Sequence, residues 1–340
     1  MSDTSDKPLV TFALFAYNQE RFIRDAVAGA IAQDYEPLEI ILSDDCSSDQ
    51  TFKIMTDMAA ANTRANVRII LNKNDRNLGL ARHVNAVMKL ADGEMIVVAA
   101  GDDISFPHRV STIVRAWMLG SKKTDCFCSR YLTIDENGEP METPSPPRPT
   151  DLTAEALAKT GLGFLGATAA WTKALWLDFG PLDDDIIIED QVIPFWAALR
   201  GGVEFIDMPL VSYRKGVSTW IDSRDGGAAK KLRETTLFLE NCSLINARAQ
   251  LAAAKHANRP DLTTDIVRRL DRRRVKYMAL SGQTGTIQGI FNMVWHGVGL
   301  RETFSVTMIK FDLGVRLLLC SKAILQRPAL APVWGWLGSR

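Results

Sequence analysis

Four apolar runs recur along the first hundred residues, and polar residues follow most of them. The runs cover residues 9–16, 38–43, 67–71 and 94–100, and residues with helical apolar spacing fill the intervals between them. An unbroken run of Ile, Val and Ala without alternation is typical of a strand buried on both faces of a parallel sheet. Because the connections are too long for hairpins, the pattern predicts an α/β fold in which helices flank a mostly parallel sheet.

The polar residues that follow these runs are expected to share one edge of the sheet. Carboxyl ends of parallel strands meet at the same edge, and ligands of open α/β sheets bind there. Three of the four predicted strands end in such a polar cluster, which capping alone does not explain. These residues are Tyr17, Asn18, Asp44, Asp45, Asp102 and Asp103.

Asp102 and Asp103 follow the fourth run directly, after Gly101. Two adjacent carboxylates repel each other unless they share a positive charge, and hard oxygen ligands suit Mg²⁺ or Mn²⁺. This favours a divalent ion that bridges the acids to a diphosphate. The alternative is that one of the two acids caps the helix that Pro107 is expected to begin.

A second acidic pair, Glu189 and Asp190, stands at the start of a predicted helix whose inner face includes Val192, Ile193 and Trp196. The helix dipole favours acids in a first turn, and this effect alone is one explanation for the presence of the pair. The other is chemical, because a carboxylate next to a hydroxyl can accept its proton as a new bond forms.

The net charge of zero conceals a division along the chain. Residues 228–340 carry 18 Lys and Arg against 7 Asp and Glu, so the preceding residues are acidic overall. Two helices are expected in this basic region, one through Leu237, Leu244 and Leu251 and the next from Asp261. They either pack on the acidic body or form a homodimer, or they make a peripheral contact with the inner face of the cell membrane.

Other features of the composition limit the class of protein. Aromatic residues do not alternate with basic ones, so no nucleic-acid partner is expected. The five cysteines are scattered, which indicates small core residues in a reducing compartment. The polar start lacks an apolar signal region and no apolar run is long enough to span a bilayer, so a cytoplasmic location is expected.

Four motifs together resemble family 2 glycosyltransferases, a family with the GT-A fold. The resemblance covers roughly residues 8–220 and predicts a GT-A domain over 8–225, a Rossmann-like, mostly parallel sheet, with a basic helical extension over 226–340. The motifs are Ala16-Tyr17-Asn18, Ser43 to Thr51, Asn77 to Arg82, and Gly101-Asp102-Asp103.

The resemblance implies a bacterial enzyme of polysaccharide synthesis that inverts the anomeric carbon of its donor sugar. The donor would be a UDP-, dTDP- or GDP-linked sugar, and the acceptor a hydroxyl of a glycan or a lipid-linked sugar. Asp190 matches the general base, with Glu189 beside it, and Asp102 and Asp103 match the ligands of Mn²⁺ or Mg²⁺. A first group of donor contacts is implied at Tyr17, Asp44, Asp45, Asn74, Arg76 and Asp102.

Residues further along the chain complete the implied site. Residues 209–218 resemble the family's loop that closes over the diphosphate, which makes Arg214 and Ser218 phosphate contacts, although an Arg without a role fits equally well. Trp171 is either an acceptor contact that stacks on a sugar or a core residue. The sequence departs from the family where Ala100 replaces an acid that many members have, and where Gly216 replaces a His.

A second class of function stays open. A nucleotide-sugar or glycan-binding protein with the same fold and no turnover would account for Ala100, whereas the presence of Asp190 argues against it. Nucleotidyl transfer on a similar sheet would need a glycine-rich basic loop after the first strand, and Tyr17 to Glu20 is not such a loop.

Overall fold

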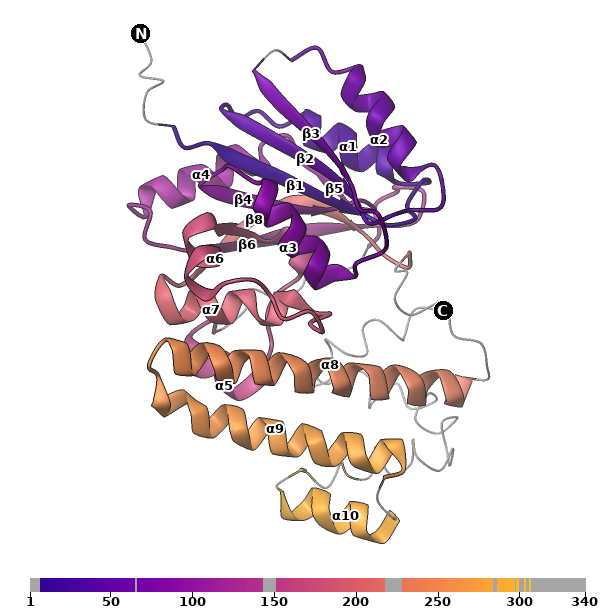
Figure 1. Cartoon of the computed structure of the whole chain (residues 1–340), viewed down its shortest axis with the longest axis vertical. Helices are drawn as coiled ribbons and strands as arrows, with labels where there is room; N and C mark the ends of the chain where they lie inside the picture. The colour runs from indigo at the N-terminus through magenta and orange to yellow at the C-terminus, as the bar shows by residue number, and fades with distance from the viewer. Residues whose placement is uncertain are drawn as a thin grey trace. The chain divides into compact units, whose positions relative to one another are not determined.

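The structure is a computed structural model, and the residues it describes are 7–64, 66–142, 151–217, 228–283, 286–296, 298–299, 303 and 306 (Figure 1). Two compact units make up the chain. The first comprises Met1–Ser218 and Ile245–Val267, and the second comprises Thr219–Leu244 and Arg268–Arg340. Residues 245–267 therefore join the first unit, although they lie beyond the predicted domain boundary at residue 225.

An eight-stranded sheet forms the centre of the first unit, with the strand order β3-β2-β1-β4-β7-β6-β8-β5. The first four strands in this order are mutually parallel, whereas β7 pairs antiparallel with both of its neighbours and β5 pairs antiparallel with β8. The sheet is mostly parallel, as predicted. The strands are β1 (Val10–Ala16), β2 (Leu38–Asp44), β3 (Val67–Lys73), β4 (Met95–Ala100), β5 (Ile104–Ser105), β6 (Cys126–Ile134), β7 (Ala170–Thr172) and β8 (Val203–Arg214).

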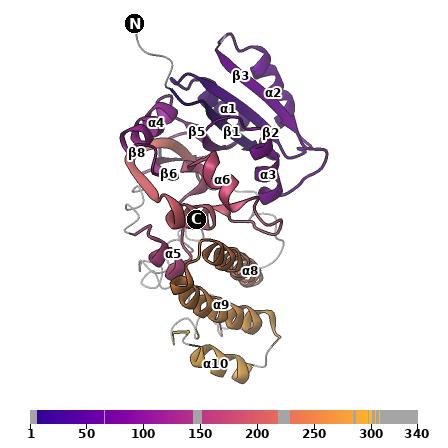
Figure 2. The ribbon, with the colours of Figure 1, turned by 60° about the vertical axis from the view of Figure 1, so that its left-hand side comes forward.

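Helices cover both faces of this sheet, which explains why strands β1, β2 and β4 are buried along both faces. One face packs against α1 (Ile23–Ile31), α2 (Thr51–Ala60) and α4 (Arg109–Leu119). The other packs against α3 (Leu80–Leu90), α5 (Ala154–Thr160), α6 (Lys173–Phe179) and α7 (Ile193–Arg200). In Figure 2, α1 lies above the strands β1 and β2 and α3 lies below them.

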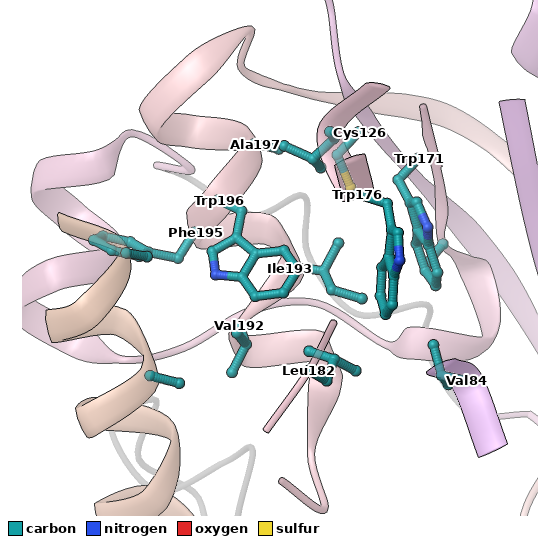
Figure 3. Close-up of a cluster of buried hydrophobic side chains, with 14 of the residues drawn as sticks. Val84, Cys126, Trp171, Trp176, Leu182, Val192, Ile193, Phe195, Trp196 and Ala197 are labelled. Carbon is teal, nitrogen blue, oxygen red and sulfur yellow. The ribbon is translucent and has the colours of Figure 1, made fainter. Parts of the chain in front are cut away.

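The second face has a core rich in tryptophan. Trp171, Trp176 and Trp196 surround Ile193 in the cluster that Figure 3 shows, and all four side chains are buried. The rings of Trp176 and Trp196 meet edge to face, with centroids 6.1 Å apart. Burial of each such side chain contributes roughly 1.5–3 kcal/mol to stability, so this cluster firmly anchors α7 and the turn that precedes it.

The prediction of a loop over residues 209–218 is wrong for most of its length. Residues Val203–Arg214 form strand β8, which pairs with β6 in parallel and with β5 in antiparallel orientation. Leu210, Val211 and Ser212 are buried in succession, as in a strand that is covered on both faces. Arg214 is the last residue of β8. The partner strand β5 directly follows Asp102 and Asp103 in the chain, so Arg214 lies near this acidic pair.

Three helices form the C-terminal part: α8 (Ala228–His256), α9 (Pro260–Ser281) and α10 (Thr286–Trp295). The first two match the helices that the apolar spacing predicts. Within the second unit, Arg273 pairs with Glu240 at 2.9 Å. Arg269 and Lys276 are buried, whereas Arg268, Arg272 and Arg274 are exposed. Some of the positive charge therefore serves packing, and membrane contact or dimer formation through residues 228–340 stays a prediction.

None of the helices in the described part of the chain combines the length and apolar character needed to cross a bilayer.

Candidate active site

The loops after β1 and β2 hold each other through polar contacts at the carboxyl edge of the sheet. Asn18, in the left-handed conformation with φ 52°, donates its backbone N–H to Ser47 Oγ at 2.8 Å. Its Oδ1 accepts the backbone N–H of Ser48 at 2.9 Å. Asp44 is fully buried and accepts both the hydroxyl and the backbone N–H of Ser47. Asp44 therefore shapes this loop, while the Tyr17 ring, 38% exposed, remains accessible.

Asp45 organises the loop that follows β3. Its Oδ1 accepts from Asn74 Nδ2 at 2.8 Å and from the Leu78 N–H at 2.9 Å, and its Oδ2 accepts from the Gly79 N–H at 3.0 Å. A carboxylate offers about four acceptor positions, so these bonds leave room for one more donor. The structure thus brings Asp45 and Asn74 together and places Arg76 on the exposed part of the same loop.

The first acidic pair lies where β4 ends and β5 begins. Gly101 lies close to Gln19 there, and an added Cβ would come within 2.4 Å of Gln19 Oε1 and displace that side chain. Asp103 is buried and its Oδ1 accepts the backbone N–H of Arg214 at 2.8 Å. Burial raises the pKa of Asp102, and burial together with the charge of Asp102 raises the pKa of Asp103 well above its usual value. Helix α4 begins only at Arg109, so neither acid caps it.

The Arg214 side chain is buried and bonded to the protein itself. Its Nε donates to the carbonyl of Asp102 at 2.9 Å, Nη1 donates to the carbonyls of Asp135 and Glu136, and Nη2 pairs with Asp25 at 3.3 Å. A guanidinium has five N–H donors, and these contacts engage four of them. In this structure Arg214 fixes the acidic pair against the neighbouring turn, and its contact with a phosphate stays a prediction.

The second acidic pair forms a short 3₁₀ turn, η2 (Glu189–Gln191), directly before α7. Both acids are partly buried. Asp190 Oδ2 accepts the backbone N–H of Gly166 at 3.2 Å, from the turn η1 (Gly166–Thr168). Burial and the charge of Asp190 raise the pKa of Glu189 to about 8, and burial raises the pKa of Asp190 to about 7. A carboxylate with this pKa holds a proton more strongly than an ordinary one, as a general base requires.

The two acidic pairs belong to one region of the first unit. Burial and the negative charges of Asp103, Asp102 and Asp190 all raise the pKa of Tyr213, so its hydroxyl is within electrostatic reach of both pairs. Arg109 links two segments of this region through hydrogen bonds. It is fully buried, and its Nη2 donates to the carbonyls of Val98, Ala167 and Ala169 at 2.7, 2.9 and 3.2 Å. It thereby ties the end of β4 to η1.

The chemistry of the first pair fits a divalent cation with an incomplete protein shell. Among the residues that the structure describes, no three His, Cys, Asp or Glu side chains form a group that would hold a metal. Two adjacent carboxylates with raised pKa values would nevertheless be stabilised by a shared cation. Mg²⁺ is commonly bound through one or two carboxylates, with substrate phosphates and water as its other ligands. Asp102 and Asp103 fit that arrangement.

The expectation that Trp171 contacts an acceptor is wrong in this structure. The side chain is 2% exposed and lies on β7 in the middle of the sheet, within the core of Figure 3. The alternative of a core residue is the correct one. Ser218 lies outside the described residues, so its contact with phosphate stays a prediction.

Sequence reasoning did not identify several residues that shape the site. An added Cβ at Gly163 would come within 1.6 Å of the Asp190 carbonyl oxygen, so this glycine is required by a close approach of two backbone segments. Its position in a stretch rich in glycine was the available signal. Arg109 carries no signal, because an arginine in the first turn of an amphipathic helix is usually exposed. Tyr213 likewise lacks a motif of its own.

Comparison with known protein families gives one match within the chain. Residues 11–176 match the family described as glycosyl transferase family 2. This range includes the first acidic pair and the η1 turn, and it ends before Glu189 and Asp190.

Two curated relatives match the same part of the chain. A putative glycosyltransferase, EpsE, of Bacillus subtilis is 33% identical over 131 residues, which are 38% of this chain and 46% of that protein. The Escherichia coli UDP-Glc:alpha-D-GlcNAc-diphosphoundecaprenol beta-1,3-glucosyltransferase WfaP is 34% identical over 127 residues, 37% of this chain and 48% of that protein. The matched part spans about half the length of these relatives.

Solved structures share the fold over most of the chain. S. aureus TarS in complex with UDP-GlcNAc superposes with a TM-score of 0.52 at 14% identity, covering 89% of this chain and 90% of that one. The mannosyltransferase PcManGT of Pyrobaculum calidifontis, in complex with GDP-Man and Mn²⁺, gives a TM-score of 0.52 at 18% identity, covering 94% and 89%. At these identities the likeness establishes the GT-A fold.

Proposed function

Because the chain belongs to glycosyl transferase family 2 through residues 11–176, we propose that it transfers a sugar from a nucleoside-diphosphate sugar to a hydroxyl group and inverts the anomeric carbon. One observation carries the proposal. Arg109 bonds Ser105, two residues after the first acidic pair, and the Ala167 carbonyl of η1, and the adjacent Gly166 N–H of η1 bonds Asp190 of the second pair. A donor bound at the first pair would thus have a proton acceptor near its reacting carbon.

Asp190 is the general base in this proposal. Burial raises the pKa of Glu189 to about 8 and that of Asp190 to about 7, so the carboxylate of Asp190 accepts a proton more readily than an ordinary one. The acceptor O–H transfers its proton to Asp190 while the acceptor oxygen bonds to the anomeric carbon. The bond from that carbon to the diphosphate oxygen breaks, and the nucleoside diphosphate leaves. A single displacement of this kind inverts the configuration.

Asp102 and Asp103 would hold Mn²⁺ or Mg²⁺ at the other end of the reacting bond. When bound, such an ion neutralises the negative charge that develops on the leaving diphosphate. The raised pKa values of both acids support this assignment, as does a structural neighbour solved with GDP-Man and Mn²⁺.

The nucleotide would lie along the loops after β1, β2 and β3. The exposed Tyr17 ring offers a surface for the base, and Asp45 retains one acceptor position for a nucleobase N–H. Neighbouring structures with UDP-GlcNAc and GDP-Man support a nucleotide-sugar donor. The relative that acts on a diphosphoundecaprenol-linked sugar supports a lipid-linked acceptor, which a protein at the inner face of the membrane would reach.

The test is release of nucleoside diphosphate by the full chain. UDP-glucose, UDP-GlcNAc and GDP-mannose are incubated with the protein, with Mn²⁺ or with EDTA, and UDP or GDP is measured with water as the acceptor. We expect turnover of at least one donor with Mn²⁺, and a loss of about 100-fold or more in Asp190→Asn and Asp102→Asn. Asp183→Asn, which alters an exposed acid in the segment before η2, is the matched control and should retain activity.

Two results separate the proposal from a binding protein with the same fold. Calorimetric binding of UDP or GDP without turnover of any of the three donors would favour the binding protein. Full activity in Asp190→Asn would exclude Asp190 as the base. Where turnover is found with a defined acceptor, NMR of the product anomer tests inversion.

A further inference from the structure

Two buried amide side chains of α8 point at the turn that carries the candidate base. Asn246 and Gln250 are one helical turn apart, so they lie on the same face of the helix. They are 1% and 0% exposed. Both belong to residues 245–267, the part of the C-terminal region that joins the first unit. A buried amide is costly unless its polar atoms are bonded, so their partners indicate what they are for.

Those partners bracket Glu189 and Asp190 in the chain. Asn246 Nδ2 donates to the carbonyl of Ile188 at 2.9 Å and to Gln191 Oε1 at 3.0 Å. Gln250 Nε2 donates to the carbonyl of Gln191. The residues immediately before and after the acidic pair are therefore both held by the same face of α8.

The turn has two backbone hydrogen bonds of its own. It is only three residues long, and the Val192 N–H donates to the Glu189 carbonyl at 2.9 Å, whereas the bond from the Gln191 N–H to the Ile188 carbonyl is long, at 3.4 Å. Its remaining supports come from other segments. Gly166 holds Asp190 Oδ2, and Gly163 lies against the Asp190 backbone. The acidic turn is thus fixed between a glycine-rich segment and the two amides.

Packing around the amides makes this contact close and rigid. Ala249 and Ala253 of α8 share a buried cluster with Val192 and Ile193, which follow the turn directly. Small side chains allow the helix to approach, and α7 lies beside the C-terminal half of α8 in Figure 1. A densely packed interface of this kind permits one arrangement of the turn instead of a range.

We propose that Asn246 and Gln250 are positioning residues for the general base, and that α8 is therefore part of the catalytic machinery. The inference rests on the proposed function, because it assigns Asp190 as the base. The amides do not touch the substrate. They set the position of the Asp190 carboxylate relative to the donor held at the first acidic pair, and a misplacement of about 1 Å lowers a rate by about 100-fold.

The test uses variants that keep the size of each side chain and remove its N–H donors. Asn246→Asp and Gln250→Met are compared with the unaltered full chain in the UDP or GDP release assay. We expect kcat to fall about 10- to 100-fold while the KM for the donor stays within about twofold, because the donor edge is untouched. UDP or GDP binding, measured by calorimetry, should also be unchanged.

Leu262→Ala is the matched control. Leu262 is buried in the same cluster as Ala249 but makes no polar contact with η2 in the described structure, so this variant lowers stability without altering the hydrogen bonds to the turn. Its thermal midpoint should fall while kcat, measured below that midpoint, stays within about twofold.

Different results overturn the two proposals. An unaltered protein that turns over none of the donors contradicts the proposed function. An active protein whose Asn246→Asp and Gln250→Met variants keep kcat within about twofold contradicts only the positioning role. So does a result in which those variants lose nucleotide binding and thermal stability together with activity, because the amides then serve only the fold.

Discussion

Gly166 donates its backbone N–H to Asp190 Oδ2 at 3.2 Å, and a side chain at the same residue would press on Glu189. An added Cβ would lie 2.9 Å from Glu189 Oε1 and 3.4 Å from Asp190 Cβ. The hydrogen bond also counters part of the effect of burial, because it lowers the pKa of Asp190. One glycine thus sets both the position and the proton affinity of the candidate base.

Gly166→Ala should lower kcat about 10-fold or more while the protein stays folded, because the added methyl group displaces the Glu189 carboxylate beside the base. Gly163→Ala should unfold or severely destabilise the protein, because its Cβ would overlap a backbone oxygen at 1.6 Å. Thermal unfolding and nucleotide release measure the two effects. Gly299→Ala is the control, since no atom of the described residues lies within 4 Å of an added Cβ there, and an equal loss in that variant would contradict the argument.

Activity should rise with pH across the neutral range. The base accepts a proton only in its charged form, and the pKa of Asp190 is about 7. We expect kcat with a saturating donor to increase about 10-fold per pH unit below that value and to level off above it. Burial raises the pKa of Asp190 without a contribution from the charge of Glu189, so Glu189→Gln should leave this acid limb near pH 7. A pH-independent kcat between 5.5 and 8 would contradict the assignment.

The same two acids should make the protein less stable as the pH rises. Their pKa values are about 7 and about 8 in the folded protein, whereas an unfolded chain releases these protons near pH 4. Between those limits the folded state binds more protons than the unfolded state, so the free energy of unfolding falls as pH increases. Asp190→Asn should therefore be more stable than the unaltered protein by ~1–3 kcal/mol at pH 8, and by almost nothing near pH 4. Urea unfolding at both values tests this.

Arg109→Lys should destabilise the protein although it keeps the charge. The guanidinium bonds Ser105 Oγ and three backbone carbonyls at once, and a lysine ammonium does not reproduce this planar arrangement. Burial lowers the pKa of Arg109 to about 9, so a lysine at this position would readily lose its proton. We expect a loss of ~3 kcal/mol or more, measured by urea unfolding. Arg115→Lys, at an exposed position of the same helix, should change stability by less than ~0.5 kcal/mol.

Trp171→Phe separates a core residue from an acceptor contact. The ring is fully enclosed, and its Nε1 finds no acceptor within the described part of the chain, so the substitution loses packing but no hydrogen bond. We expect a loss of ~1–2 kcal/mol in urea unfolding and unchanged kcat and KM in the nucleotide release assay. A rise in the KM of a defined acceptor without loss of stability would restore the acceptor role.

The sequence predicted the parts of this protein in which local pattern and tertiary structure agree. The apolar runs that became β1, β2 and β4 are buried on both faces, whereas β3 at the edge of the sheet is only partly buried. The acids after β2 and β4 lie at one edge, as strand direction requires. Residues 203–214 were harder to predict. Their strand character depends on pairing with β6 and β5, which are far away in the chain, and polar residues at its exposed end resemble a loop.

The supports of the candidate site were not predictable for a related reason. Asn246 reaches the Ile188 carbonyl across 58 positions of sequence, and no spacing rule connects an amide in a long helix with a turn in another segment. Arg214 was predicted to contact a phosphate. In the structure its guanidinium is buried and donates to Asp102, Asp135 and Asp25 of the protein itself. Residue type indicated the chemistry, and packing determined which groups are free to perform it.

The order of synthesis adds a consequence for the helix α8. A ribosome completes the entire sheet edge and both acidic pairs before it adds Gln250, whose amide holds the Gln191 carbonyl 59 positions earlier. A nascent or prematurely released chain that ends near residue 225 would therefore contain every acid of the proposed reaction and still lack the groups that fix its base. Exchange of C-terminal regions between relatives should preserve residues 245–267, because a junction placed upstream would separate the base from its support.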